Sequence, residues 1–507
     1  MSASAAPLNR FMITFGVMAA TVMQVLDMTI VNVALPDMMG SLSASTDQIS
    51  WVLTSYLVAS AVMMPLTGYF SDKLGRRRFL LLSIGGFVLA SAMCGFAFDL
   101  SSILLFRIVQ GIFGAALVPL SQAVMIDVFP LEERGKAMAI WGMGVMVGPI
   151  LGPTLGGYLT EYFSWRWTFF INLPVGLLSF ALAERYIPDT PKRERSMDWR
   201  GLLLASTAIA CMQFVLDRGN QDGWMGSTSI LSLTVLGVVS FIFFLVHALT
   251  TTRKPVFDVR MFKDKNFATG CFMILVMGLG LFGSMVIQPL FLEGLLGYPT
   301  LDTGLLMAPR GIASMFSMML VGRLLGRVDT RLIVGTGILL TALGSYFMTY
   351  YNFNIDPFWI VWPAMVQGLG LGMIFVPVST VALSTLAPRL AAEGAGLFSL
   401  MRTLGSSIGI SVATTLYTRG IQTDWNLLGG YIQPYNPQLR PYLDSMHQTP
   451  DSPLGIQLLA QELARQAQIV ALTETFAIIT LSVIAMLPLL VFLRGKLPRR
   501  GPPVVSE

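Results

Sequence analysis

The stretch GYFSDKLGRRR, residues 68–78, separates two apolar runs near 51–71 and 79–98. Apolar runs of about twenty residues are long enough to cross a bilayer as helices. Glycines allow a tight turn, arginines favour an anionic lipid surface, and an aspartate can pair with an arginine or face a helix N-terminus. The stretch therefore predicts a short polar loop between two membrane-spanning helices. Its expected functional residues are Gly68, Asp72, Gly75, Arg76, Arg77 and Arg78.

The composition agrees with a membrane setting. Of the 507 residues, 54% are hydrophobic and 12% are charged, about half the charged fraction of a soluble globular protein. A bilayer accepts apolar side chains on the outside of a fold whose backbone is hydrogen-bonded within helices. The chain is therefore expected to be an all-α integral membrane protein. Cys94, Cys211 and Cys271 lie inside apolar runs without metal-ligand spacing, so no metal site or disulfide framework is expected.

Runs of this kind recur along the whole chain and predict fourteen spans. They lie near 11–35, 51–71, 79–98, 103–126, 137–160, 166–187, 199–216, 228–250, 266–292, 303–325, 331–351, 358–386, 394–419 and 469–494.

The basic residues are distributed unevenly between the two sides of these spans. If the N-terminus is cytoplasmic, 25 of the 33 Lys and Arg residues fall in inside loops and 5 in outside loops. This bias predicts that both termini are cytoplasmic. It also explains the net charge of +5 without a nucleic-acid partner.

A weak internal repeat favours fourteen spans over twelve. Val109-Gln-Gly111 and Val118-Pro-Leu-Ser121 recur as Val366-Gln-Gly368 and Val376-Pro-Val-Ser379, about 257 residues later. Six spans and their loops need roughly 190 residues, so an insertion of about 60 residues separates two halves. The expected units are a six-helix half at 1–198, two inserted helices at 199–260, and a six-helix half at 261–507.

One outside loop, 420–468, is far longer than the others and rich in Gln, Asn, Pro and Tyr. One interpretation is a solvated linker. The other is a docking surface or gate on the outer face, in which Ile456–Gln468 forms a short helix.

Two charged residues are expected inside the first half of the bundle. Asp27, in LDMTIVNVALP (residues 26–36), lies mid-span, where a carboxylate held away from water can bind and release a proton. Arg107, in the fourth span, either bonds to carbonyls of a neighbouring helix or tunes the proton affinity of a nearby carboxylate. Proton coupling at Asp27 and an ion pair with Arg107 are compatible interpretations.

The fifth span contains GMGVMVGPILGPTLGG, residues 142–157. Glycines four residues apart leave one smooth helix face for close packing, and prolines bend a helix. The residues that define this pattern are Gly144, Gly148, Pro149, Gly152, Pro153 and Gly156.

Other polar residues in or near spans have open roles. Asn32, Gln110 and Arg402 are candidates for a substrate contact or an ion pair. Glu474, near the outer end of the last span, is a partner for a basic group or a second proton site. Arg310, beside Pro309, is expected toward the outside, where its side chain can extend to the interface.

These motifs carry a family resemblance. The 68–78 stretch resembles the signature loop of the major facilitator superfamily, and the fifth span is similar to the antiporter motif of its exporting branches. The LDMTIVNVALP string resembles the first helix of the fourteen-span drug:proton antiporters, the group of EmrB-type multidrug exporters. The resemblance covers nearly the whole chain, including WRWTFFINLP (165–174) and the long outer loop.

The resemblance implies a major facilitator fold of two six-helix halves plus two inserted helices. It implies proton-driven antiport that exports hydrophobic or amphipathic drugs across the bacterial inner membrane by alternating access, conferring antibiotic resistance. It further implies a tripartite efflux pump with a periplasmic membrane-fusion adaptor and an outer-membrane channel, and no cofactor beyond the proton gradient. Ala364 replaces the arginine in the second-half copy of the fourth span, so coupling is expected in the first half.

Two alternatives remain. One is a dedicated proton-coupled exporter of a single metabolite, such as a siderophore or fatty acid. The other is a membrane-embedded lipid enzyme or a receptor, but His247 and His447 are the only histidines and form no catalytic constellation. No nucleotide-binding loop is present, so ATP is not the expected energy source, and the chain is not expected to be an enzyme.

Overall fold

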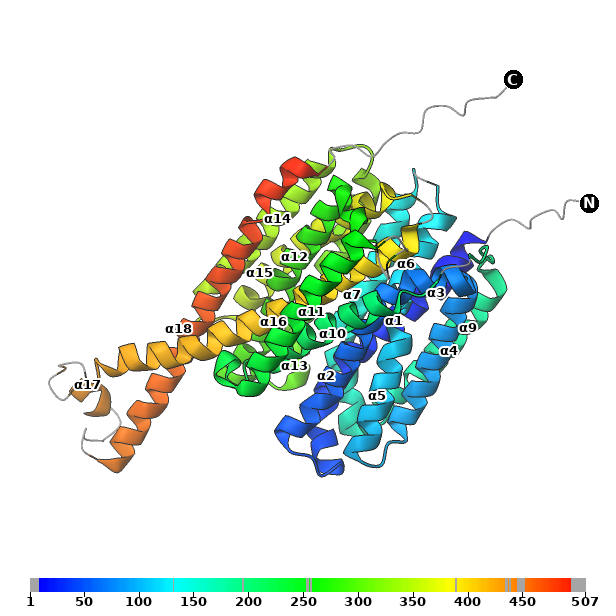
Figure 1. Cartoon of the computed structure of the whole chain (residues 1–507). Helices are drawn as coiled ribbons and strands as arrows, with labels where there is room; N and C mark the ends of the chain where they lie inside the picture. Colours follow the sequence, from blue (N-terminus) through cyan, green and yellow to red (C-terminus); the bar gives the residue numbers. More distant parts are fainter. Residues whose placement is uncertain are drawn as a thin grey trace, which may run out of the picture.

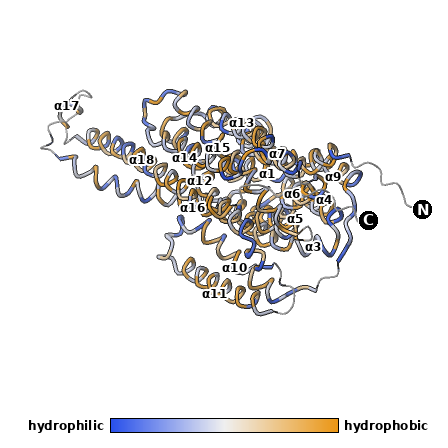
Figure 2. Tube along the Cα trace, turned by 90° about the horizontal axis from the view of Figure 1, so that it is seen from above, coloured by the Kyte–Doolittle hydropathy of each residue, from blue (hydrophilic) through white to orange (hydrophobic). Residues whose placement is uncertain are grey.

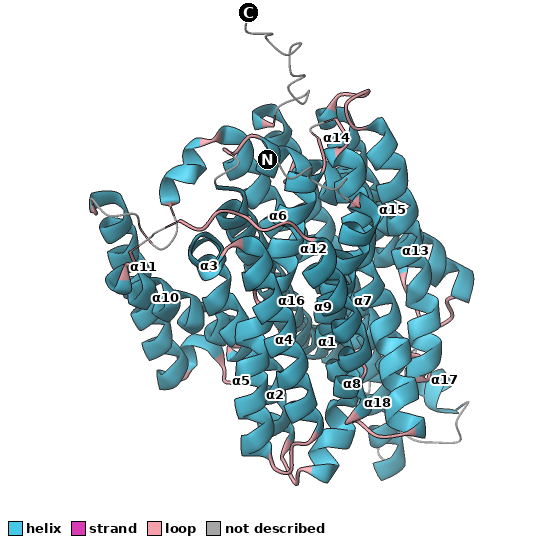
Figure 3. Cartoon of the chain, turned by 90° about the vertical axis from the view of Figure 1, so that its right-hand side faces the viewer, coloured by secondary structure: helices cyan, strands magenta, loops and turns pink. Residues whose placement is uncertain are grey.

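The structure is a computed structural model that describes residues 9–130, 132–193, 196–251, 255, 258–387, 390–433, 436, 439–444 and 452–493. Within these ranges the chain is a bundle of helices with no β-strand (Figures 1 and 3). Thirteen of the described helical stretches are long and apolar enough to cross a membrane. The expected all-α membrane fold is therefore confirmed.

The first six spans follow the expected order. Two of them are interrupted, the second at Pro65 and the fourth between Gly114 and Leu117. Their helices are α1 (Arg10–Ser41), α2 (Thr46–Met63), the 3₁₀ turn Met64–Leu66, α3 (Thr67–Leu74), α4 (Arg76–Gly95), α5 (Leu100–Gly114), α6 (Leu117–Val128), α7 (Arg134–Tyr162), α8 (Trp167–Phe170) and α9 (Asn172–Tyr186).

The inserted pair is α10 (Trp199–Arg218) and α11 (Thr228–Thr250), linked through the 3₁₀ turn Trp224–Gly226. Figure 2 shows the two helices side by side at the edge of the bundle. The remaining helices are α12 (Lys265–Pro289), α13 (Thr300–Leu324), α14 (Thr330–Phe347), α15 (Pro357–Ser384), α16 (Ala391–Gly429), α17 (Leu439–Asp444) and α18 (Pro453–Ile484), with 3₁₀ segments at Val259–Lys263, Met348–Tyr350 and Leu487–Phe492 and a π-helical turn at Leu290–Leu295.

One of the fourteen expected spans, 394–419, lies in α16, which is not among the thirteen apolar stretches. This helix has 39 residues, so its length is sufficient. Arg402 and a series of Gly, Ser and Thr residues lower its hydropathy. Its buried side chains nevertheless pack against α12 and α18 inside the bundle, which explains why a more polar helix occupies this place.

The long outer loop is more helical than expected. α16 continues to Gly429, and α18 begins at Pro453 and runs without a break into the last span. The predicted helix at Ile456–Gln468 is therefore confirmed as the first part of α18. Figure 1 shows α16 and α18 projecting together beyond the bundle, with α17 at their tip. We call this projection, residues 420–433 and 452–468, the outer hairpin.

Polar residues mark where helices begin. The side chain of each such N-cap accepts a hydrogen bond from a backbone N–H of the first turn. At the start of α5, Asp99 and Ser102 form a reciprocal capping box, and the hydrogen bonds from Ser102 hold the pKa of the exposed Asp99 below its usual range. The N-caps with such bonds are Asn9, Ser45, Asp99, Asp198, Asp258, Asp264, Asp329, Asp356 and Ser452.

Large apolar side chains cover the outside as well as the core. α11 illustrates this, since Phe241, Phe243 and Leu249 are each at least half exposed. A soluble protein does not expose hydrophobic surface on this scale, whereas lipid accepts it. The helices themselves approach closely through small residues, which is typical of membrane bundles.

α10 touches both six-span groups. Toward the first group, Arg218 donates to Ser50 Oγ of α2 over 2.6 Å. Toward the second, Gln213 donates to Ser407 Oγ of α16, also over 2.6 Å. The inserted helix therefore bridges α2 and α16.

Candidate functional site

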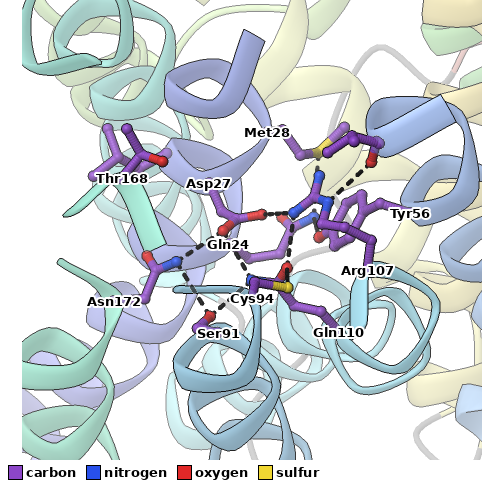
Figure 4. A network of polar contacts seen from close by, with 12 residues as sticks. Gln24, Asp27, Met28, Tyr56, Ser91, Cys94, Arg107, Gln110, Thr168 and Asn172 are labelled. Carbon is purple, nitrogen blue, oxygen red and sulfur yellow. Dashed lines mark hydrogen bonds and ion pairs between the residues drawn. The ribbon is translucent and has the colours of Figure 1, made fainter. Parts of the chain in front are cut away.

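Asp27 lies on α1 and is fully buried among polar side chains from several helices (Figure 4). Its Oδ2 accepts a hydrogen bond from Arg107 Nη1 at 2.7 Å. Its Oδ1 accepts bonds from Gln110 Nε2 at 2.9 Å and from Asn172 Nδ2 at 2.8 Å. The carboxylate is therefore surrounded by three donors, one of them positively charged.

Arg107, on α5, is also fully buried. Besides Asp27, its guanidinium donates to the backbone oxygen of Val52 at 3.0 Å and to Gln110 Oε1 at 2.8 Å. It lies over the ring of Tyr56, 4.2 Å from the ring centroid, a cation–π distance. The arginine therefore binds both a carbonyl of α2 and the carboxylate of α1, whereas its effect on the proton affinity of Asp27 stays a prediction.

Gln110 links the ion pair to α4. Its amide nitrogen also donates to Ser91 Oγ at 2.7 Å, and its oxygen accepts from Cys94 Sγ at 3.6 Å. Asn172 reaches the same Ser91 at 3.3 Å. The network thus joins α1, α2, α4, α5 and α9 and depends on one protonatable carboxylate.

Three side chains hydrogen-bonded in this network, those of Asn172, Ser91 and Cys94, were not predicted as site residues. Asn172 was noted only as part of a sequence string, although an asparagine inside an apolar span is itself a signal of an internal partner. Ser91 gives no such signal, because serine is common in spans. Asn32, a candidate one and a half turns after Asp27 on α1, is exposed and makes no bond with any residue that the structure describes.

The glycine face of α7 positions α1 and hence Asp27. A Cβ on Gly148 would lie 2.6 Å from Val25 Cγ1, and one on Gly152 would lie 2.6 Å from Thr29 Cβ. The hydroxyl of Thr29 bonds back to the carbonyl of Gly148 at 3.0 Å. Pro149 and Pro153 lie within an unbroken α7, and Gly144 and Gly156 continue the same contact. Only glycine allows this approach on both sides of Asp27.

The expectation of a loop at 68–78 was wrong, because the stretch is helical except at Gly75, which separates α3 from α4. It lies at one end of the bundle, which we call the basic end. Gly75 has φ +84°, a left-handed conformation that favours glycine. The backbone N–H of Arg76 donates to Thr190 Oγ1 at 2.8 Å, and its side chain pairs with Asp127. Arg77 pairs with Asp189 at 3.2 Å. These bonds fasten the junction between α3 and α4 to α6 and to the chain after α9.

The same stretch approaches the second group of helices. A Cβ on Gly68 would lie 2.7 Å from the Cβ of Glu393, at the start of α16. The backbone oxygen of Asp72 accepts a bond from the N–H of Arg193, while Arg78 is exposed. The two six-span groups are therefore in contact at the basic end.

A second, uncharged copy of the network lies in the later helices. Gln367 of α15 donates to Ser284 Oγ of α12 at 3.2 Å and to Ser345 Oγ of α14 at 2.9 Å. Gln367 and Ser284 each stand 257 residues after Gln110 and Asp27. The glutamine is thus repeated and again donates to a serine of a neighbouring helix, whereas the aspartate is replaced by serine and the arginine by Ala364.

The other expected residues lie apart from this network. Glu474 is exposed on α18, and Arg402 is half-buried on α16; neither bonds to any residue in the described ranges. The expectation for Arg310 was wrong. It is 4% exposed and donates to Gln288 Oε1, because that buried amide provides an acceptor inside the bundle. No cluster of metal-ligating residues occurs in the described part of the chain.

Comparison with known proteins identifies relatives across almost the whole chain. The model of the Major Facilitator Superfamily matches residues 17–410. The chain is 35% identical to multidrug export protein EmrB of Escherichia coli K12 over 469 residues, 91% of each protein. It is 34% identical to fatty acid resistance protein FarB of Neisseria gonorrhoeae over 482 residues, 94% of each.

Solved structures share the fold at low identity. The human organic anion transporter MFSD10 (TETRAN) superposes with a TM-score of 0.61 at 15% identity, covering 94% of this chain and 99% of that one. Three findings lead to the same assignment. The chain is an all-helical membrane bundle, the family model matches most of its length, and its relatives are more than 30% identical to it. This chain belongs to the Major Facilitator Superfamily.

Proposed function

We propose that the chain is a proton-driven antiporter that exports hydrophobic or amphipathic compounds, and that it is a transporter rather than an enzyme. The observation that carries the proposal is the fully buried Asp27–Arg107 pair. A charged pair at such a depth is costly in a membrane bundle and is typical of proton or ion pathways. The 35% identity to a multidrug export protein supports export as the direction.

The network offers a way to couple a proton to a helix movement. A proton on Asp27 removes the negative charge that attracts Arg107. The 2.7 Å hydrogen bond between α1 and α5 then loses its charge–charge attraction and becomes weaker. Arg107 keeps its bond to the carbonyl of Val52, and Gln110 keeps Ser91. Protonation therefore weakens the contact of α1 with α5 but not the other contacts of Arg107 and Gln110. A substrate that binds better to the unprotonated arrangement disfavours protonation of Asp27.

The moving parts are the two six-helix halves, 1–198 and 261–507, with 199–260 as an insertion between them. In alternating access these halves rock against each other, and this movement requires contacts that separate on one side of the bundle. Gly68 against Glu393 at the basic end is one such contact. With both termini cytoplasmic in the bacterial inner membrane, this contact closes the inner side. The proton gradient alone drives the cycle, without a cofactor.

The outer hairpin is the proposed attachment point for a periplasmic membrane-fusion adaptor, which links to an outer-membrane channel. A hollow of about 300 Å³ lies between its two arms. Its walls include Leu428, Tyr431, Leu459 and Leu463, so it is mainly apolar. An exposed apolar hollow outside the lipid is suited to a protein partner.

A second candidate function is export of one metabolite. The 34% identity to a fatty acid resistance protein supports a fatty acid as that metabolite. The proton site would be unchanged, and only the range of exported compounds would differ.

Vesicles containing the purified protein test the proposal. A lipophilic drug is added, and proton movement is followed with a pH-sensitive dye for the native chain, Asp27→Asn and Glu474→Gln. We expect proton movement to disappear in Asp27→Asn and to persist in Glu474→Gln, because only Asp27 belongs to a buried network. Drug binding, measured separately by fluorescence, should survive in Asp27→Asn.

Proton movement that persists in Asp27→Asn would refute the coupling role of this residue. Loss in Glu474→Gln alone would transfer that role to α18. To separate the two candidate functions, the same assay is repeated with a series of chemically unrelated drugs and with medium-chain fatty acids.

A further inference from the structure

Arg310 on α13 is a buried cation whose charge is not neutralised by any residue that the structure describes. Its side chain donates to the neutral amide of Gln288 through Nη2. The remaining nitrogens, Nε and Nη1, are buried and have no acceptor in the described part of the chain. Three N–H bonds are therefore directed into the bundle without a partner.

The nearby acceptors are already engaged. The amide nitrogen of Gln288 faces the hydroxyl of Tyr351 at 3.5 Å, and that hydroxyl donates to the backbone oxygen of Ile360 at 3.3 Å. Gln288 and Tyr351 are nearly inaccessible, and Tyr351 stacks against Phe291 with ring centroids 5.0 Å apart. The surroundings thus contain neutral polar groups and aromatic rings but no described carboxylate contact.

In the first half of the chain, by contrast, the charge of the buried arginine is neutralised. The Arg107 guanidinium bonds to the Asp27 carboxylate, to a carbonyl and to an amide oxygen. Ser284 occupies the position that corresponds to Asp27, one helical turn before Gln288 on α12. The second half thus keeps a buried guanidinium but not the carboxylate.

An unpaired charge inside a membrane bundle is costly, and an arginine does not lose its proton to avoid that cost. A bound anion removes this cost. We propose that Arg310 holds a monovalent anion, which is either an inorganic halide or the carboxylate head of an amphipathic substrate. The unpartnered Nε and Nη1 of a single guanidinium match one negative charge, and the aromatic surroundings suit an alkyl chain.

The carboxylate occupant rests on the proposed export function, whereas the halide occupant does not. The test therefore measures binding and needs no transport. Purified native protein in detergent is transferred to sodium gluconate and titrated with chloride at constant ionic strength. The melting temperature is followed, and bound ³⁶Cl⁻ is counted by equilibrium dialysis. We expect saturable stabilisation and about one bound chloride per chain.

Three variants locate the site. Arg310→Gln should raise the half-saturating chloride concentration by about tenfold or more, because the charged donor is lost. Arg310→Lys should bind with intermediate strength, because it keeps the charge but not the planar edge. Arg323→Gln should behave as the native chain, since Arg323 is an exposed arginine on the same helix.

Decanoate and decanol distinguish the two sources of the anion. Displacement of ³⁶Cl⁻ by decanoate but not by decanol means that the site takes a substrate carboxylate. Retention of chloride in the presence of decanoate means that the occupant is an inorganic ion. If the native chain binds no chloride or decanoate saturably, or if Arg310→Gln binds them as well as the native chain, the proposal is wrong. Should Arg310→Gln fail to fold, Arg310→Lys and the count on the native chain decide.

Discussion

A double-mutant cycle on Asp27 and Arg107 measures how strongly the buried pair holds the bundle together. Both side chains are fully buried, and their atoms approach to 2.7 Å. Asp27→Asn preserves the shape of the side chain but leaves a buried positive charge. Arg107→Gln leaves a buried negative charge. Removing one partner of such a pair typically costs about 3–5 kcal/mol.

The double variant should recover part of that loss, because no unpaired charge remains. We expect each single variant to lower the free energy of unfolding by ~3 kcal/mol and the double variant to be ~2 kcal/mol more stable than the sum of the two losses predicts. The free energy of unfolding is measured by reversible denaturation in mixed micelles. Arg331→Gln combined with Asp27→Asn is the control. In the described part of the chain, the Arg331 side chain bonds to the Val491 and Leu493 carbonyls and not to the Asp27 network, so those two effects should add.

Additive losses in the Asp27–Arg107 cycle would refute the reasoning. They would mean that Gln110 and Asn172 alone satisfy the carboxylate and that the ionic contact contributes no coupling. A coupling that vanishes only at low pH would instead link the pair to protonation, as the proposed mechanism requires.

Three further outcomes follow from the described contacts. Gly152→Val should destabilise the protein by ~1–3 kcal/mol and slow export, because a Cβ at position 152 would lie 2.6 Å from the Cβ of Thr29 on α1. Gly157→Ala, with nothing within 4 Å, is the matched control, and melting and transport are measured for both. Asp99 has a lowered pKa in the folded state, so its stabilising effect is present above about pH 4 and is lost as the pH falls. The difference in melting temperature between native protein and Asp99→Ala should therefore shrink below that pH; an unchanged difference would contradict the assignment. Gln213→Leu should weaken the link from α10 to α16 and speed hydrogen exchange in both helices, with a loss of ~1 kcal/mol; unchanged exchange would mean that the bond does not hold them.

The sequence predicted the charged core of the site because charged residues are rare inside spans. Asp27 and Arg107 stood out for that reason, and the structure places them in contact. Asn172 and Ser91 were missed as partners because neutral polar side chains are tolerated in membrane helices. Which of them face inward depends on how five helices pack, and a single sequence does not contain that information directly.

Hydropathy also explains the errors in the fold. It reports how well a segment suits lipid, not whether the segment is helical. The polar arms of the outer hairpin therefore fell within an expected loop. The helix expected there in one interpretation, IQLLAQELARQAQ (456–468), is rich in Gln and Ala, which favour helix, and the structure confirms it. Arg310 was placed at the outside because of its position along α13. The buried acceptor on Gln288 comes from another helix and could not be seen from the neighbouring residues.

The unbroken course of α18 has a mechanical consequence. From Pro453 to the start of the last span it extends as a rigid rod of about 25 Å. Because the rod has no joint where it leaves the bundle, a tilt of about 10° in the last span swings its tip by ~4 Å. A molecule attached at the tip would therefore be displaced by this distance whenever the last span tilts, which is far enough to rearrange its own contacts. Movement of the last span would therefore be carried directly to the outer hairpin.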